Sequence, residues 1–543
     1  MRKKILMFAC LIFFFIGCES DFMDHNGNNQ EGEVITILQT GDIHSYLDSH
    51  PELFVSNNSI VFRKAGGLAN IKTLIDKIRN NNPNGTLLVD GGDLIQGSGE
   101  SVHSKGKISP PLIREMKYDV LIPGNWEVVY GKQAMIDVMS DYKTNVIAAN
   151  MFHKENNNFI FPPYWITEKK GIKIGFIGYN DPEIPIRQNP AFSEGIKFTE
   201  IESNLKELIT ELKENKKVDV LFLVTHIGIS KQVLLSNNPA VEGVDFILGN
   251  DTHERIRKPI QGKYANVIEP GAFGSFVGKL DLKIKENKMI GYNYDLIEVN
   301  PSKYPPNQKM QYLVDQAKAP YRQEMQQVLG YTSTPIYRYL VVENPMDNMI
   351  TDALLWKSGA DFSVSNGFRF GVPIIPDQTG KKAITKEDLW RMLPVDERIK
   401  IGEVTGQQIK DWLEKEINNV FSKDLSKRFG GWLVRFSGMT LKFDSSKETG
   451  NRILKITIKG KPLDLNATYK MATFNRTGEP MNVLCRLSNA KNVVIKDYTL
   501  HDTMEEYLQA NGTVSPKLDG RSIAVDLGTN AFSQLSGTDY VFR

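Results

Sequence analysis

The chain has 543 residues, of which 41% are hydrophobic, and this is enough for two or three domains with buried cores. Its formal net charge of +2 gives no reason to expect a nucleic-acid partner, because nucleic-acid binding needs a concentrated basic face. Two of the three cysteines, Cys10 and Cys18, lie near the N-terminus. Only Cys485 remains, so we expect no disulfide in the mature chain.

Residues 1–18 have the layout of a secretory signal. A basic start precedes an apolar run over residues 5–16, which is shorter than the about 20 residues that span a bilayer. A glycine followed by Cys18 resembles a bacterial lipoprotein cleavage site, and the alternative is a plain signal peptide with an incidental cysteine. Residues 19–32 are polar, as in a flexible tether. We therefore expect an exported lipoprotein, held at the membrane by a lipid on Cys18 and displayed in the periplasm or at the cell surface.

Five later segments share one pattern, in which a hydrophobic strand ends in side chains that can bind a metal. The first, ITILQTGDIH, begins at Ile35. The ligand candidates after the five strands are Asp42 and His44, then Asp93, then Asn125, then His226, and finally Asp251 and His253. Ligands collect beyond the carboxyl ends of strands in an open, mostly parallel sheet, so we expect one shared site. A single Asp-x-His triplet is usually a surface loop, but the repeated pattern favours a shared site over scattered polar turns.

Helical and strand patterns alternate along residues 33–303. Residues 66–80 and 201–217 have the spacing of amphipathic helices, and residues 171–180 predict a further core strand. This alternation indicates a layered α/β domain. Residues 304–330 are largely polar and predict a linker helix.

The last part of the chain, residues 331–543, predicts a separate α+β domain. Residues 346–360 and 404–421 have helical patterns, and the chain beyond residue 432 is mainly strand-like. Five histidines lack a strand-end context and are expected in loops or on the surface; they are His25, His50, His103, His153 and His501.

Motifs along nearly the whole mature chain resemble those of the metallophosphoesterase and 5′-nucleotidase family. In chain order they are GDIH, GGLAN, VDGGD, GNWE, THIG, GNDTH, SNGFR, ITKEDL, VTGQQIKDWLE and GGWLVRFSG. The resemblance implies a four-layer α/β/β/α metallophosphatase domain followed by an α+β 5′-nucleotidase-type domain that binds substrate. It also implies two divalent metal ions, and mixed carboxylate, amide and imidazole ligands suit Mn²⁺, Zn²⁺ or Fe²⁺.

The resemblance also assigns site residues. The first metal would be held by Asp42, His44, Asp93 and His253. The second would be held by Asp93 as a bridging ligand, with Asn125, His226 and Asp251. Two metals at such a site can activate a bridging water and neutralise charge on the oxyanion that is attacked. The expected catalytic residues are Asp93, Asn125 and Trp126.

Two positions in the catalytic domain depart from the family pattern. Trp126 stands where the family usually has a histidine that can assist the leaving group, and an indole cannot carry a proton to an alkoxide. Such a loss typically costs about 10² to 10⁴ in rate, and it matters least for a thiolate, whose conjugate acid has a pKa of roughly 8 to 9. Asp251 replaces the first histidine of Gly-His-x-His. It could still bind a hard metal ion, or point elsewhere and leave the second metal weak or absent.

The substrate-binding domain departs too. Nucleotidases clamp the base between two aromatic side chains, and Trp432 occupies one of those places. The stretch for the other place contains Arg476, which can stack on a base but also fits an anionic substrate. Arg369 of the SNGFR motif would grip the oxyanion with paired hydrogen bonds, with Asn366 beside it, although Arg369 could instead form a core salt bridge.

At several of these positions the sequence is similar to that of the sulfur-oxidation thiosulfohydrolases of the same superfamily. The shared features are the Trp-Glu pair after Asn125, the segment from Gly367 to Gly371 and a late Gly-Glu-Pro. Three hypotheses therefore remain open. The chain could release phosphate from a small anionic substrate such as a nucleotide, hydrolyse a cysteine S-thiosulfonate on a carrier, or be a metal-poor binding module without catalysis.

Overall fold

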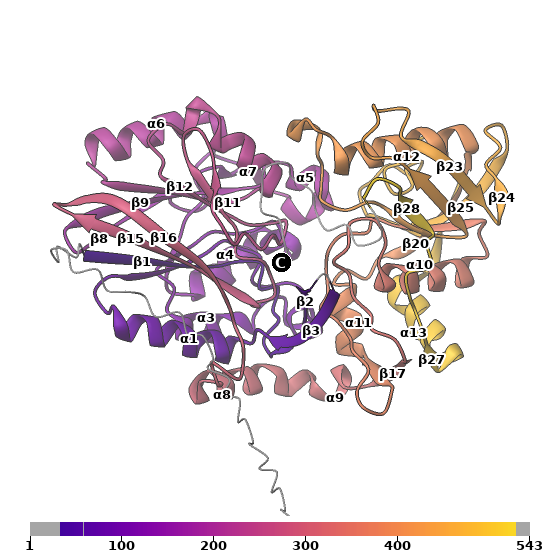
Figure 1. Ribbon diagram of the computed structural model, residues 1–543, viewed down its shortest axis with the longest axis horizontal. Helices are drawn as coiled ribbons and strands as arrows, with labels where there is room; N and C mark the ends of the chain where they lie inside the picture. Colours follow the sequence, from indigo (N-terminus) through magenta and orange to yellow (C-terminus); the bar gives the residue numbers. More distant parts are fainter. Residues whose placement is uncertain (1–32, 58, 528–543) are drawn as a thin grey trace, which may run out of the picture.

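The computed structural model describes residues 33–57 and 59–527, and the expected leader and tether lie outside this part. Figure 1 shows two lobes, the first running from indigo to magenta along the chain and the second from orange to yellow. Helices α8 (Gln308–Lys318) and α9 (Arg322–Met325) lie below them, between the last strand of the first lobe and the start of the second. The domain boundaries expected at residues 303 and 330 stay predictions.

Two six-stranded sheets form the first lobe. The first sheet has the order β16-β15-β1-β4-β5-β6. Its strands are β1 (Glu33–Thr40), β4 (Thr86–Asp90), β5 (Val120–Leu121), β6 (Asn145–Val146), β15 (Phe276–Lys285) and β16 (Lys288–Glu298). The second sheet has the order β13-β14-β12-β11-β9-β8. Its strands are β8 (Tyr164–Lys169), β9 (Ile172–Asn180), β11 (Val220–His226), β12 (Phe246–Gly249), β13 (Ile260–Gln261) and β14 (Asn266–Ile268).

The two sheets pack face to face over one apolar core. Ile37 and Leu87 of the first sheet belong to the same buried cluster as three stacked rings of the second, Phe176, Phe222 and Phe246. The ring centroids are 5.0 Å and 5.9 Å apart along that stack. Burying such rings removes large apolar areas from water, which holds the sheets together.

Helices cover the outer face of each sheet. Helices α1 (Leu68–Asn81), α3 (Ser109–Met116) and α4 (Lys132–Asp141) share a buried cluster with Leu38 and Leu88 of the first sheet. Helices α6 (Leu205–Thr210) and α7 (Ile229–Ser236) share another with Leu221 and Leu223 of the second sheet. The predicted four-layer α/β/β/α architecture is confirmed.

Two details of the first lobe differ from the expectations. The five ligand-bearing strand ends belong to two packed sheets, with β1, β4 and β5 in one and β11 and β12 in the other, and not to a single open sheet. The continuous helix expected over residues 201–217 is broken into η3 (Ile201–Ser203), α6 and a π-helical segment (Glu211–Asn215). Asn204 interrupts it, because its side chain bonds the Ala149 carbonyl and the Tyr179 hydroxyl outside the helix.

The second lobe, described as far as residue 527, has three sheets and four helices of seven residues or more. A five-stranded sheet contains β18 (Phe362–Ser365), β20 (Arg398–Thr405), β21 (Arg435–Ser437), β25 (Thr468–Phe474) and β26 (Lys491–Thr499). The smaller sheets contain β17 (Val328–Thr332), β19 (Lys382–Thr385), β22 (Met439–Phe443), β23 (Ile453–Ile458), β24 (Lys461–Pro462), β27 (Thr513–Val514) and β28 (Ser522–Ala524). The helices are α10 (Pro345–Ser358), α11 (Lys386–Met392), α12 (Gly406–Phe421) and α13 (Leu500–Asn511). The predicted α+β character is confirmed.

Helix α13 was missed by the sequence analysis, although it has a recognisable start. Thr499 and Asp502 form a capping box at its N-terminus. His501 is buried in this helix, and its Nε2 lies 2.8 Å from the Leu393 carbonyl oxygen. His50 is also buried, at the start of β2 (His50–Ser56), so the surface or loop prediction was wrong for both histidines.

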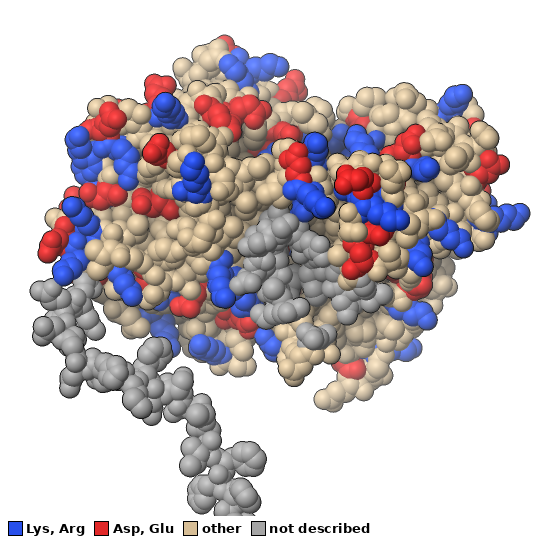
Figure 2. Space-filling view, turned by 45° about the horizontal axis from the view of Figure 1, so that its top comes forward, with Lys and Arg blue, Asp and Glu red and all other residues tan. Residues whose placement is uncertain are grey.

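The lobes are joined by polar and apolar contacts. Lys318, at the end of α8, bonds Asp48 of the first lobe and lies 3.0 Å from Glu387 of the second. The hairpin of β2 and β3 (Ser59–Ala65) packs Leu53 against Tyr339 of the second lobe. Positive and negative side chains are interspersed over the face in Figure 2. None of the described helices is long and apolar enough to cross a membrane.

Candidate metal centre

Five of the seven expected metal ligands stand on left-handed backbone. The φ angles are 51° at Asp42, 51° at His44, 59° at Asp93, 94° at Asp251 and 60° at His253. Residues with a Cβ rarely adopt such angles, and they persist only where surrounding contacts impose them. Each of these residues follows a buried strand, β1, β4 or β12. The turn after the strand therefore directs the side chain into the space between the sheet ends.

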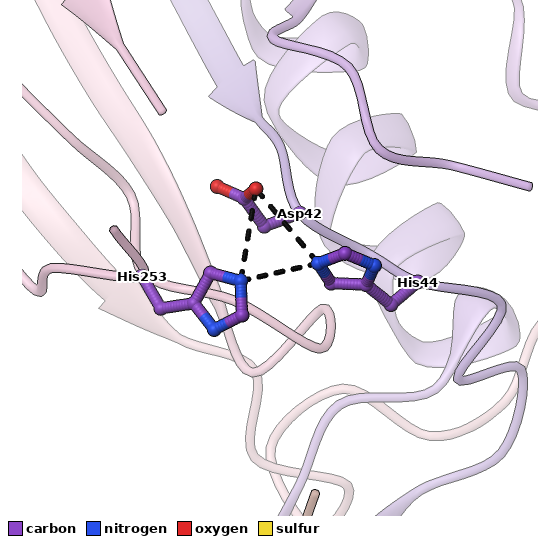
Figure 3. Close-up of side chains that lie close together, drawn as sticks. All are labelled: Asp42, His44 and His253. Carbon is purple, nitrogen blue, oxygen red and sulfur yellow. Dashed lines mark hydrogen bonds and ion pairs between the residues drawn. The ribbon is translucent and has the colours of Figure 1, made fainter. Parts of the chain in front are cut away.

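One group of ligand atoms comprises Asp42, His44 and His253 (Figure 3). Asp42 Oδ1 lies 3.9 Å from His44 Nε2 and 3.8 Å from His253 Nε2, and the two Nε2 atoms are 3.1 Å apart. His44 Nδ1 is 2.9 Å from the Gln96 carbonyl oxygen, which can only accept a hydrogen bond. The proton of a neutral His44 therefore belongs on Nδ1, and Nε2 presents its lone pair to the group.

A second group comprises Asp42, Asp93 and His226, with Asn125 beside it. His226 Nε2 lies 3.0 Å from Asn125 Oδ1, 3.2 Å from Asp93 Oδ2 and 3.8 Å from Asp42 Oδ1. Its Nδ1 is 2.7 Å from the Gly91 carbonyl oxygen, so a neutral His226 would keep its proton on Nδ1 and present Nε2 as the ligand atom. Asp42 is common to both groups, whereas we expected Asp93 to bridge. Asp93 Oδ2 faces both as well, at 3.6 Å from His44 Nε2.

The carboxylates of the site favour a positive charge among them. Burial opposes charge on His226, yet Asp93, Asp42 and Asp251 together raise its pKa well above the usual value. Burial raises the pKa of Asp42. Burial also opposes charge on Asp93, but the charge and hydrogen bond of His226, the charge of His44 and the Trp126 backbone N–H together lower the pKa of Asp93. Burial lowers the pKa of His253 well below its usual value. Clustered carboxylates beside a neutral imidazole form a donor set that suits a divalent ion.

One of two unpaired buried polar atoms supports the fit. Asp42 Oδ1 and His253 Nδ1 have no hydrogen-bond partner among the described residues. An unpaired buried polar atom is costly, and an ion near Asp42 Oδ1 would satisfy that oxygen. The residues that would hold such ions are Asp42, His44, Asp93, Asn125, His226 and His253, which the structure brings together. Their assignment to one ion or the other stays a proposal.

Asp251 has a different environment. Its Oδ1 lies 3.8 Å from His226 Nε2, within reach of the second group. Both of its carboxylate oxygens, however, accept hydrogen bonds from Arg187, at 3.0 Å and 3.1 Å. Arg187 was not among the expected site residues, because no motif relates it to Asp251 across 64 residues.

Trp126 and Glu127 follow Asn125 and have separate roles. The Trp126 backbone N–H donates to Asp93 Oδ1 at 2.7 Å, and its indole stacks near Phe368, with ring centroids 6.4 Å apart. Glu127 accepts hydrogen bonds from the backbone N–H groups of Gly124, Asp93 and Leu94 at 2.6 to 2.9 Å. Burial raises the pKa of Glu127 to about 7. Glu127 thus ties the Asp93 loop to the Asn125 loop; it was not among the expected site residues, although it belongs to the GNWE motif.

A cavity of about 270 Å³ opens beside the ligand groups, between the lobes. From the first lobe it is lined by Asp93, Asn125, Trp126, Asp251 and His253. All four expected substrate-binding residues line it from the second lobe; they are Asn366, Arg369, Trp432 and Arg476. The other ligand candidates, Asp42, His44 and His226, are fully buried behind it.

The two arginines of the second lobe are engaged differently. Arg369 is 3% exposed, and its Nη1 donates to Glu254 at 3.0 Å, so it does form the core salt bridge. Its Nη2 is buried without a hydrogen-bond partner among the described residues, which leaves one donor for an anion. Arg476 Nη1 donates to the carbonyl oxygens of Ile186 and Arg187, at 2.9 Å and 3.1 Å. Arg476 therefore joins the two lobes at the edge of the cavity.

Comparison with known proteins gives two family models. Residues 35–255 match the calcineurin-like phosphoesterase model, and residues 328–477 match the 5′-nucleotidase C-terminal domain model. The trifunctional nucleotide phosphoesterase protein YfkN of Bacillus subtilis is 23% identical over 91% of this chain, which spans only 35% of YfkN. The 5′-nucleotidase of Vibrio parahaemolyticus is 22% identical over 94% of this chain and 95% of its own length.

The fold is also similar to that of solved structures. The sulfate thiohydrolase SoxB of Thermus thermophilus, solved in complex with glycerol, superposes with a TM-score of 0.81. The alignment covers 93% of this chain and 98% of SoxB at 19% sequence identity. At this identity the likeness shows the shared fold alone.

Proposed function

The chain belongs to the metallophosphoesterase and 5′-nucleotidase family, and from this premise we propose that it is an exported enzyme with two divalent ions that releases phosphate or a similar oxyanion. Its class, a metal-dependent hydrolase of the phosphoesterase type, follows from the family models and the 5′-nucleotidase relatives. The export, the number of ions and the substrate are our proposals. We further propose that a lipid on Cys18 anchors the enzyme to the membrane.

One observation carries the proposal. Imidazole, amide and carboxylate atoms from five strand ends face one another at 3.0 to 3.9 Å and adjoin a cavity between the lobes. Divalent ions bound there would activate water and neutralise charge on the oxyanion. A metal-poor binding module would have no need for the buried and unpaired Oδ1 of Asp42.

The protein side chains orient and stabilise the substrate. The free Nη2 of Arg369 supports a role in holding an oxyanion, because a guanidinium donates along fixed directions. The indoles of Trp126 and Trp432 and the ring of Phe368 line the same cavity and can pack against a flat or apolar part of the substrate.

Because Trp126 cannot protonate a leaving group, we also consider substrates whose leaving group needs no proton. Among the described histidines, only His253 lines the cavity, and it is an expected metal ligand. A leaving group that departs as an anion without protonation, such as a thiolate, suits that arrangement. A cysteine S-thiosulfonate is therefore our second candidate beside a nucleotide, with the nucleotide favoured by the relatives.

Substrate assays separate the two candidates. Purified enzyme with added Mn²⁺ would be given AMP, 2′,3′-cyclic AMP and a peptide that carries a cysteine S-thiosulfonate. Rapid phosphate release from a nucleotide supports the phosphoesterase and counts against the thiosulfonate. Sulfate release from the peptide, with no phosphate from any ester, reverses that choice. If none of the three substrates is hydrolysed, the proposed function is contradicted.

A further inference from the structure

Asp251 stands where the family resemblance places a metal ligand, and it is held by a side chain from another segment. Arg187 ends the short helix α5 (Ile184–Arg187) and lies 64 residues before Asp251. Two parallel hydrogen bonds join the guanidinium to the Asp251 carboxylate, at 3.0 Å and 3.1 Å. This bidentate geometry fixes both the position and the plane of the carboxylate.

The Asp251 backbone shows why this support matters. Its φ of 94° is the largest positive value among the described residues other than glycine. A residue with a Cβ keeps such an angle only where other contacts impose it. Its backbone N–H donates to Asp42 Oδ2 at 3.1 Å, and its carboxylate is bonded by Arg187. Without the guanidinium, the carboxylate would be free to rotate away from His226.

Arg187 is itself fixed from both lobes. In the first lobe, its Nη1 also donates to the fully buried Asp181 at 2.6 Å. From the second lobe, Arg476 donates to the backbone carbonyl of Arg187 at 3.1 Å. Gly478 follows in the same loop with a φ of 88°, and a Cβ there would lie 2.8 Å from Pro190 Cδ. The second lobe thus presses closely on the segment that carries Arg187.

We infer that Arg187 is a positioning residue, which sets the Asp251 carboxylate as a ligand of the second ion and is held in place by docking of the second lobe through Arg476. This inference rests on the proposed pair of ions. The charge of Arg187 is shared with Asp181, so its main effect on the second ion is to orient Asp251 rather than to repel the ion. Loss of such a supporting partner typically costs about 10- to 100-fold in metal affinity.

The test measures Mn²⁺ binding to the metal-free full-length protein by equilibrium dialysis and electron paramagnetic resonance. We expect the wild type to bind two Mn²⁺ ions and to give the spectrum of a coupled pair. Arg187→Met should lower the affinity for the second ion about 10- to 100-fold and leave the first ion bound. The spectrum should then become that of an isolated Mn²⁺.

Further variants separate positioning from charge. Arg187→Lys keeps the charge but cannot form the two parallel hydrogen bonds to Asp251. It should therefore also lower the affinity for the second ion. In an Asp251→Asn background the effect of Arg187→Met should largely disappear, because the oriented carboxylate is gone. Lys231→Met is the matched control: Lys231 lies 2.5 Å from Glu183 and 3.5 Å from Asp181 in the same network but does not bond Asp251. Arg476→Gln should also lower the affinity for the second ion, but by less than Arg187→Met does.

Each outcome decides one point. If both Arg187 variants bind the second Mn²⁺ ion as tightly as the wild type does, Arg187 has no positioning role. If Arg476→Gln binds it as tightly as the wild type does, docking of the second lobe does not support Arg187. Retention of the first ion shows that a variant is folded. If Arg187→Met does not fold, the affinities of Arg187→Lys and Arg476→Gln for the second ion still test the inference. A wild type that binds fewer than two ions overturns the proposed function itself, and the inference with it.

Discussion

At the scale of single residues, Trp126 most directly affects the expected chemistry. Its backbone supports Asp93, while its indole stacks near Phe368 beside the cavity. The backbone role needs no particular side chain, whereas the indole sets what can happen to a leaving group. An indole N–H donates one hydrogen bond and keeps its proton. Hydrolysis of an alkyl phosphate should therefore be limited by departure of the alkoxide.

Trp126→His tests this limit. If an imidazole at this position can protonate the leaving group, phosphoesterase activity toward AMP should rise by about 10²-fold, the lower end of the usual contribution of a general acid. Steady-state phosphate release measures the effect, with Trp126→Phe as the control for lost stacking. Equal activity in the histidine and phenylalanine variants would show that protonation of the leaving group is not limiting.

Asp93 provides the second prediction at this scale. Its Oδ2 lies 3.2 Å from His226 Nε2 and 3.6 Å from His44 Nε2, so it faces both ligand groups. Asp93→Ala should abolish turnover, because the second group loses a ligand and the first loses the carboxylate that faces His44. Circular dichroism should show an intact fold, since the loop remains tied by Glu127 through backbone hydrogen bonds. Normal turnover in this variant would mean that Asp93 is misassigned and that Asp42 alone joins the groups.

The site residues differ in how far the sequence could predict them. Asp42, His44 and His226 end strongly hydrophobic strands, so their positions follow from local pattern and strand direction. Arg187 could not be found in this way, because its partner Asp251 is distant in sequence and an arginine in a loop carries no local signal. Arg369 was predicted as an oxyanion clamp with a salt bridge as the alternative, and its two Nη atoms are in different environments.

At the scale of elements, helix α10 supports the second-lobe wall of the cavity from behind through Asp347. Asp347 in its first turn accepts hydrogen bonds from Arg338, at 2.6 and 2.8 Å, and from Arg435 at 3.3 Å. All three side chains are at most 2% exposed. Burial lowers the pKa of Arg435 to about 10, despite Asp347 beside it. The Arg338 guanidinium lies 5.2 Å from the Phe368 ring centroid, so this network supports the aromatic wall.

Asp347→Ala should destabilise the protein strongly. Removing one partner from a buried ionic network leaves uncompensated charge and typically costs about 3 to 5 kcal/mol. Urea unfolding followed by circular dichroism would measure the loss. The matched control is Asp526→Ala, which removes a carboxylate from an exposed hydrogen bond with Ser445 and should change stability by less than about 0.5 kcal/mol. A similarly small change in Asp347→Ala would show that the network does not hold the wall.

Elements were predicted where one local signal dominated. Helix α12 has a strong helical periodicity and was expected over residues 404–421, close to its observed bounds. Strand β11 is a continuous apolar run that ends at His226, as expected. The break at Asn204 was not predictable, because it depends on hydrogen bonds to Ala149 and Tyr179 across the fold. Helix α13 was predictable in principle from the Thr499 and Asp502 capping box, but the strand-like surroundings masked it.

At the scale of the whole molecule, two packed sheets and a second lobe together make one site. The first sheet supplies Asp42, His44, Asp93 and Asn125, and the second supplies His226, Asp251 and His253. The second lobe closes the cavity with Arg369 and Trp432. Hydrophobic pattern alone predicted α/β layers, but not that the ligands would come from two sheets. That arrangement depends on how the two sheets pack, and the family resemblance gave the two layers of sheet without saying which sheet carries which ligand.

The central claim is that these strand ends hold two cations. It is tested most directly by a crystal structure of the full chain with Mn²⁺, with diffraction data recorded at the manganese absorption edge. We predict two anomalous peaks about 3.5 to 4 Å apart, one beside His44 and His253 and the other beside Asn125 and His226. A single peak, or none among these side chains, would contradict the claim.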